Sequence, residues 1–169
     1  MDLPFDVVDL GPTDHPEAGE QAPDFRRPLV TDEFWEDRAL SELTDEGPVL
    51  LLFHPMDGAF PATYMYNELR DRGLGDDIRV VGCSISTPYE HKAFIDDREV
   101  DFALFSDPTN EVAQQYDVVH DLDGMTGVTE PRPAVFVVDG ERVVRYAWVA
   151  REWPDFPDYE DLEAAIAEV

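Results

Sequence analysis

From residue 49 onward, short apolar runs alternate with segments whose apolar residues recur at helical spacing. Val49–Phe53 is a continuous apolar run, which is typical of a strand buried on both faces. Residues 60–72 carry Met65 and Leu69 four positions apart and are followed by Gly73, a pattern that predicts a helix ending there. Residues 78–84 predict a second buried strand.

Turn and cap residues mark the elements of the second half. Thr87-Pro88-Tyr89-Glu90 has the form of a capping box with proline in the first turn, which predicts the start of a helix. Asp139-Gly140 between two apolar runs predicts a β-hairpin. The predicted elements are a helix from 87 to about 98, a strand at 101–105, a helix at 107–116, a loop at 117–131, strands at 134–138 and 143–149, and a helix at 158–169.

The order of elements from residue 49 is β-α-β-α-β-α-β-β-α. This alternation predicts an α/β domain with a central mixed sheet and helices on both of its faces. No linker divides it, and the length suits one domain.

The pattern is weaker before residue 49. Residues 1–18 are rich in Asp, Pro and Gly, with one apolar patch at 5–10, and we interpret them as an N-terminal arm or a short edge strand. Residues 31–46 place Trp35, Ala39 and Leu43 on one face and predict a short helix. The predicted organisation is therefore an arm at 1–18 followed by one domain at 19–169.

Negative charge is spread along the whole chain. Asp and Glu number 39 against 12 Lys and Arg, which gives a formal net charge of -27. Because the acidic residues are scattered rather than gathered in one tail, we interpret the charge as a property of the whole surface. Repulsion on such a surface weakens at high salt, which favours a salt-rich cytosol and a halophilic source. Nucleic acids and anionic membranes are unfavourable partners for it.

The chain has a single cysteine, Cys83. One cysteine excludes a disulfide within the chain, a cysteine-based zinc cluster and a Cys-x-x-Cys reductase. No apolar run approaches the length of a transmembrane helix. The acidic start at residues 1–6 lacks the basic region of a secretory signal, so we expect a cytoplasmic protein.

Six short motifs occur in order along residues 19–169, and together they resemble the alkyl hydroperoxide reductase C / thiol-specific antioxidant group, the peroxiredoxins. The motifs are Gly19-x-x-Ala22-Pro23-Asp24-Phe25, Phe53-x-Pro55-x-Asp57, Val81-Gly82-Cys83-Ser84, His91-x-x-Phe94, Ser106-Asp107-Pro108, and Arg132 before an apolar strand and an Asp-Gly hairpin. The resemblance implies a thioredoxin-like redoxin fold and a role in antioxidant defence as a thiol peroxidase. No bound cofactor or metal is expected.

Two departures from the family pattern fall in its catalytic loop. Peroxiredoxins usually read Phe-x-Pro-x-x-x-Thr-x-x-Cys there, whereas this chain keeps Pro55 but has Ala59 at the threonine position and Ala62 at the cysteine position. Peroxide reduction needs a thiolate that becomes a sulfenic acid. We therefore predict that peroxidase activity is lost or strongly reduced. Tyr64 and Tyr66 are candidates to fill the space of the lost peroxide pocket.

Arg132 resembles the active-site arginine of the family but lies one residue farther from Asp139 than usual, and Pro133 occupies the arginine position. Either the strand carries a one-residue bulge or Arg132 is displaced. We favour displacement, because thioredoxin-fold proteins commonly carry a cis-proline at that position. A guanidinium near the helix N-terminus would form a site for a small anionic or peroxide-like ligand. The alternative is an exposed partner for a carboxylate.

Four further candidates each have a structural alternative. Cys83 lies near the carboxyl end of a central strand, where such sheets carry their sites, but a cysteine in a strand core is commonly inert. His54 is expected to pack beside the catalytic loop with a polar tip. His91 is expected on a helix surface or at a pocket rim. His120-Asp121-x-Asp123-Gly124 lacks a complete set of metal ligands and favours a solvated turn.

Two functions remain open. The first is a peroxiredoxin-family protein without its peroxidase activity. If the alanine at 62 were engineered, the parent would be a one-cysteine peroxidase, but the simultaneous Ala59 argues against a single engineered change. The second is a non-catalytic binding module or a homodimer built on the same fold.

Overall fold

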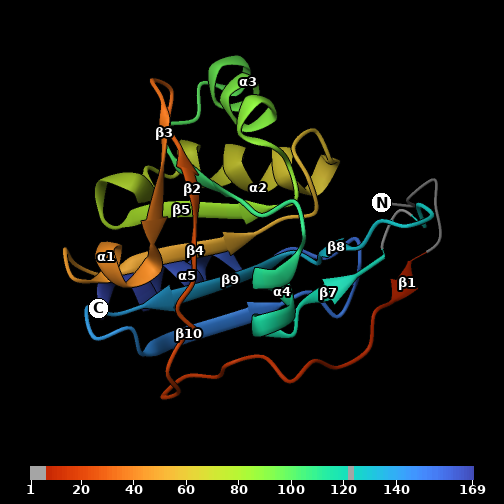
Figure 1. The fold of residues 1–169 in the computed structure, drawn as a ribbon. Coiled ribbons are helices and arrows are strands. Elements are labelled where there is room, and N and C mark those ends of the chain that lie inside the picture. The colour runs from red at the N-terminus through yellow and green to blue at the C-terminus, as the bar shows by residue number, and fades with distance from the viewer. Residues whose placement is uncertain (1–6, 122–123) are drawn as a thin grey trace.

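Residues 7–121 and 124–169 are described in the computed structural model. Their centre is a seven-stranded mixed sheet in the order β10-β9-β4-β5-β6-β2-β3 (Figure 1). Its strands are β2 Arg26–Val30, β3 Trp35–Ala39, β4 Val49–Phe53, β5 Arg79–Ser84, β6 Ala103–Ser106, β9 Ala134–Val138 and β10 Val144–Val149. The helices are α1 Leu40–Thr44, α2 Phe60–Asp71, the 3-10 turn η1 Leu74–Asp76, α3 Pro88–Arg98, α4 Glu111–Tyr116 and α5 Tyr159–Ala167.

Two apolar cores lie on opposite faces of the sheet. All five residues of β4 are buried, and they alternate between the cores, with Leu51 and Phe53 in one and Leu50 and Leu52 in the other. Helices α1 and α4 cover the first face, and α2, α3 and α5 cover the second. The predicted thioredoxin-like α/β fold with helices on both faces is confirmed.

The predicted strands and helices from residue 49 onward are present. In the β9–β10 hairpin, the Asp139 carboxylate accepts the backbone N–H groups of Glu141 and Val143, both at 2.9 Å. The capping box of α3 is formed, with the Thr87 N–H donating to Glu90 at 3.0 Å and the Glu90 N–H donating to Thr87 Oγ1 at 3.4 Å. These local signals are therefore read correctly from sequence.

The predicted helix at 31–46 is wrong over its first half. Residues Trp35–Ala39 form the edge strand β3, which pairs with all five residues of β2, and only Leu40–Thr44 is helical. Trp35 is 38% exposed, whereas Leu43 is fully buried. The open edge of β2 supplies hydrogen-bond partners that the helical pattern does not reveal, so tertiary pairing overrides the local preference.

Smaller differences occur in the connections. Strand β2 was not predicted, and α4 begins at Glu111 rather than at 107, because the Asp107 carboxylate accepts the Val112 N–H across the preceding turn at 2.8 Å. The predicted loop at 117–131 contains two short strands, β7 Val119–His120 and β8 Glu130–Pro131, which pair with each other. Asp123 of the His120 motif lies outside the described residues.

The beginning of the described chain pairs with the segment before α5. Strand β1 Val8–Asp9 pairs antiparallel with β11 Glu152–Trp153, and Leu10 is buried beside it. The predicted arm or short edge strand at 1–18 therefore contains the two-residue strand Val8–Asp9, while Phe5 and Asp6 lie outside the described residues. The domain boundary at 18/19 stays a prediction. Among the described helices, none has the length and hydrophobicity needed to cross a membrane.

Candidate functional site

Polar side chains gather where three parallel strands end. Strands β4 and β5 are parallel, as are β5 and β6, so their carboxyl ends meet at one edge of the sheet. His54 directly follows β4, Ser84 and Ser106 end β5 and β6, and all three are buried. This edge is where open α/β sheets usually carry their sites.

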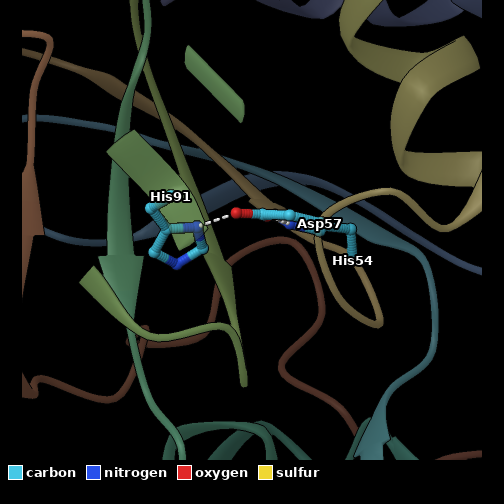
Figure 2. A group of neighbouring side chains, drawn as sticks. All are labelled: His54, Asp57 and His91. Carbon is cyan, nitrogen blue, oxygen red and sulfur yellow. Dashed lines mark hydrogen bonds and ion pairs between the residues drawn. The ribbon is translucent and has the colours of Figure 1, made fainter. Parts of the chain in front are cut away.

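Three side chains at this edge form a cluster that we call the His–Asp–His cluster: His54, Asp57 and His91. Figure 2 shows Asp57 between the two imidazoles. His54 Nε2 lies 2.8 Å from Asp57 Oδ1, and His91 Nδ1 lies 2.7 Å from Asp57 Oδ2. Both imidazoles are fully buried, and the Asp57 side chain is 7% exposed. Two histidines from different elements thus hold one carboxylate.

The loop between β4 and α2 is fixed by backbone bonds to the neighbouring strand ends. The His54 N–H donates to the Cys83 carbonyl at 3.2 Å, and the Asp57 N–H donates to Ser86 Oγ at 2.9 Å. Ser86 is itself held by the Ser106 hydroxyl, which donates to the Ser86 carbonyl at 2.6 Å. The carboxylate is therefore positioned by the scaffold as well as by the two imidazoles.

Tyr66 of α2 contacts the ring nitrogen of His54 that faces away from Asp57. Its hydroxyl lies 3.1 Å from His54 Nδ1, and the phenol is fully buried. It passes over Gly82 of β5, where a Cβ atom would come within 1.8 Å of the Tyr66 oxygen. Glycine at 82 is required for this contact, because any larger residue would displace the phenol. Of the two tyrosines predicted to fill the lost pocket, Tyr66 is buried and Tyr64 is 62% exposed.

Hydrogen-bond partners locate the protons of His91. Its Nε2 lies 3.0 Å from the Phe105 carbonyl, which only accepts, so Nε2 carries a hydrogen. Burial by itself raises the pKa of Asp57, but the hydrogen bonds from His54 and His91 outweigh it and hold the pKa well below its ordinary value. Asp57 is then a carboxylate, and His91 donates to it from Nδ1 as well. Both ring nitrogens of His91 thus face hydrogen-bond acceptors.

His54 is the neutral member of the cluster. Burial lowers its pKa, and Asp57 only partly offsets that effect. With Nε2 donating to Asp57, Nδ1 is left to accept the hydrogen of the Tyr66 hydroxyl. Burial also raises the pKa of Tyr66 well above its ordinary value, which keeps that hydroxyl protonated.

The first turn of α2 carries no comparable chemistry. Ala62, at the position of the family cysteine, is fully buried in the apolar core beneath α2. Ala59, at the threonine position, is the residue that precedes the helix, and Pro55 is buried in the loop before it. At the two positions where the family pattern has a thiol and a hydroxyl, this chain has methyl groups.

Arg132 stands two residues before β9, whose first residue Ala134 pairs with Phe53 at the end of β4, but its guanidinium is hydrogen-bonded to other segments. Its guanidinium donates to the carbonyls of Gly11, Ala150 and Leu10 at 3.0, 3.2 and 3.2 Å, and it is 5% exposed. The alternative of an exposed partner for a carboxylate is therefore wrong. Pairing of β9 with β4 is continuous from Ala134 to Val138, so that strand shows no bulge there.

The prediction of a cis peptide bond before Pro133 is also wrong. The one cis peptide bond among the described residues joins Trp153 and Pro154.

Cys83 faces away from the position of the missing sulfur. Its side chain packs on the α1/α4 face of the sheet, with Phe53, Phe105 and Tyr116, whereas Ala62 lies on the opposite face. Cys83 is fully buried, and burial raises the pKa of its thiol well above the ordinary value. A thiol in this environment is mostly protonated and poorly nucleophilic.

Sequence reasoning missed the partnership of His91. It was expected on a surface or a pocket rim, yet it is fully buried and bonded to Asp57 and Phe105. A usable signal was present: His54 and Asp57 directly follow a buried strand, and His91 follows the capping box of the next helix. Parallel pairing of β4 with β5 brings these two segments together, which a linear pattern does not show.

Comparison with known proteins gives a consistent picture. A model of the AhpC/TSA family matches residues 18–147. The chain is 28% identical over 142 residues to a chloroplastic 2-cysteine peroxiredoxin of Chattonella marina var. antiqua, covering 78% of this chain and 70% of that protein. It is 26% identical to the chloroplastic 2-Cys peroxiredoxin BAS1 of Spinacia oleracea over 80% of this chain, and it spans about half, 53%, of that protein. Peroxidoxin BcpB of Mycobacterium tuberculosis has a similar structure, with a TM-score of 0.72 and 27% identity over 90% of this chain and 96% of that one.

Proposed function

The chain belongs to the AhpC/TSA family, and from this premise we propose that it is a peroxiredoxin-family protein whose thiol peroxidase activity has been lost or strongly reduced. The observation that carries the proposal is the fully buried methyl group of Ala62 on the first turn of α2. A methyl group can neither attack a peroxide oxygen nor become a sulfenic acid.

Cys83, the one cysteine of the chain, is not placed to replace the missing cysteine. Cys83 lies on the other face of the sheet and is fully buried, so a peroxide would have to enter the α1/α4 core to reach it. The guanidinium of Arg132 donates to the carbonyl groups of Gly11, Ala150 and Leu10, so these hydrogen bonds hold it away from the role of a cation that stabilises a thiolate. Both observations support the absence of thiol chemistry.

Peroxide consumption with a dithiol donor in molar potassium chloride tests the proposal. The wild type and Cys83→Ala should both match the protein-free rate. Turnover by the wild type that disappears in Cys83→Ala would overturn the proposal and make Cys83 the nucleophile. Turnover that persists in Cys83→Ala would overturn it in favour of chemistry without sulfur.

A second candidate is a homodimer that uses the surface around the first turn of α2. Phe60, Tyr64 and Phe156 are 38%, 62% and 37% exposed, and their rings contact one another. Clustered exposed aromatic side chains are typical of interaction surfaces. Light scattering in molar salt should then give a dimer that Tyr64→Asp converts to a monomer. Tyr89→Asp, at a residue 75% exposed and away from this cluster, is the matched control.

We further propose a salt-rich cytoplasmic setting, because the net charge of -27 produces repulsion that salt screens. The melting temperature should rise steeply from low to molar potassium chloride. A melting temperature that does not change with salt would contradict this setting.

A further inference from the structure

We propose that His54, Asp57 and His91 form a binding site for one divalent first-row transition-metal ion. The site, whose three side chains Figure 2 shows, lies at the carboxyl edge of the sheet, on the loop between β4 and α2 and on α3. It does not depend on the loss of thiol peroxidase activity, because none of its three ligands is a sulfur.

The ligand atoms already converge. His54 Nε2, His91 Nδ1 and the Asp57 carboxylate all lie within 4.8 Å of one another, and the two contacts to the carboxylate are 2.8 and 2.7 Å. A metal ion bound at about 2.0–2.2 Å from each ligand places its ligands roughly 3 Å apart. The cluster therefore needs only a small widening of the two contacts and a convergence of the rings by about 1–2 Å.

Each imidazole has the outer partner that a metal-binding histidine requires. His91 directs Nδ1 to the cluster while Nε2 donates to the Phe105 carbonyl at 3.0 Å. His54 directs Nε2 to the cluster while Nδ1 contacts the Tyr66 hydroxyl at 3.1 Å. Such second contacts fix the ring orientation in metal sites, and they are the independent observation in favour of a ligand here.

Binding is balanced in protons and charge. His54 moves its hydrogen from Nε2 to Nδ1, where the Tyr66 oxygen accepts it, and His91 releases its Nδ1 hydrogen to solvent. Two neutral imidazoles and one carboxylate then carry a single negative charge toward a doubly charged ion. The long-range field of a chain with net charge -27 also attracts cations.

The ligand types select the class of ion. Two imidazole nitrogens and one carboxylate suit Zn²⁺, Fe²⁺ or Co²⁺, whereas Ca²⁺ and Mg²⁺ prefer all-oxygen sites. The Asp57 side chain is nearly buried, but the next residue in the loop, Gly58, is exposed. The ion is therefore approached through this loop, where water can complete its coordination.

Co²⁺ serves as the probe, because its visible absorption reports nitrogen coordination. Metal-free full-length protein is titrated with Co²⁺ in molar potassium chloride containing excess Mg²⁺, which occupies the surface carboxylates. We expect one Co²⁺ per chain with the spectrum of imidazole ligation, and displacement of Co²⁺ by Zn²⁺. No saturable binding, or a spectrum of oxygen ligands alone, would overturn the proposal even if every variant failed to fold.

Variants locate the ion. His54→Gln, Asp57→Asn and His91→Gln should each weaken binding at least about 100-fold. His120→Gln is the matched control, because His120 is another histidine beside an aspartate, with Nδ1 3.5 Å from Asp121. Tyr66→Phe keeps all three ligands and should weaken binding about tenfold. Equal binding by wild type and the ligand variants that remain folded, or loss in His120→Gln alone, would overturn the assignment.

Discussion

Two neighbouring parts of one sheet edge have opposite character. Ala59 directly before α2 and the buried Ala62 in its first turn carry only methyl groups, whereas the preceding loop and α3 hold the His–Asp–His cluster. Both depend on the same carboxyl ends of β4 and β5. The difference teaches that polar and apolar positions can lie side by side at the edge where open α/β sheets carry their sites.

The two parts also differ in what their residues contribute to stability. Ala62 is packed among apolar side chains, and no polar group depends on it. In the cluster each member satisfies another, so removing one leaves a buried charge or polar atom without its partner. Substitutions should therefore have large effects in the cluster and small ones on the turn.

The largest effect is expected from His91→Ala. It leaves the nearly buried Asp57 carboxylate without one of its two hydrogen-bond partners and should lower the free energy of unfolding by about 3–5 kcal/mol. Lys92→Ala is the control on the same helix, because Lys92 is half-buried and makes a surface ion pair with Asp96, whose loss should change stability by less than about 1 kcal/mol. Urea unfolding in molar salt measures both, and equal losses would show that the hydrogen bond between His91 and Asp57 is not important to the fold.

Metal addition should give the next largest effect. At a free Co²⁺ concentration one hundred times its Kd, the wild type should gain about 2.7 kcal/mol in unfolding free energy, and chelation should remove the gain. Asp57→Asn should gain less than about 0.5 kcal/mol under the same conditions, because its Kd is at least about 100-fold higher. A similar gain in both proteins would assign the stabilisation to surface carboxylates.

Tyr66→Phe should cost about 1 kcal/mol. The substitution removes the hydroxyl that lies 3.1 Å from His54 Nδ1 and leaves the ring in its core. Thermal unfolding at fixed salt measures the change. Tyr64→Phe, at an exposed position of the same helix, should have no measurable effect, and a larger loss there would contradict the role given to Tyr66.

The smallest effect on stability is expected from Ala62→Cys, at less than about 1.5 kcal/mol. Its informative readout is alkylation of the native protein, in which Cys83 of the wild type should stay unmodified because it is fully buried. The introduced thiol at 62 should react no faster than a free cysteine, since Arg132 is bonded elsewhere. Rapid labelling of the wild type would contradict the placement of Cys83.

The sequence was sufficient where local signals decide the structure. The apolar run of β4, the capping box at Thr87 and the Asp139-Gly140 turn each place an element correctly. It failed at Trp35–Ala39, where pairing with β2 decides, and at Arg132, whose partners lie more than a hundred residues away at Leu10 and Gly11.

The sequence predicted which family residues are absent from the site, but it did not predict the His–Asp–His cluster. Ala59 and Ala62 stand out against the family pattern because each is a direct substitution. His54, Asp57 and His91 form no linear motif, since His91 joins the other two only through the parallel pairing of β4 with β5. Such a cluster depends on tertiary contacts, which spacing along the chain does not reveal.

Anomalous diffraction at the cobalt edge, from crystals equilibrated with Co²⁺ and excess Mg²⁺, tests most directly whether the reactive groups of this edge lie in the cluster. One dominant peak in contact with His54 Nε2, His91 Nδ1 and the Asp57 carboxylate is the predicted result. Peaks confined to surface carboxylates, with Asp57 still bonded directly to both imidazoles, would contradict it.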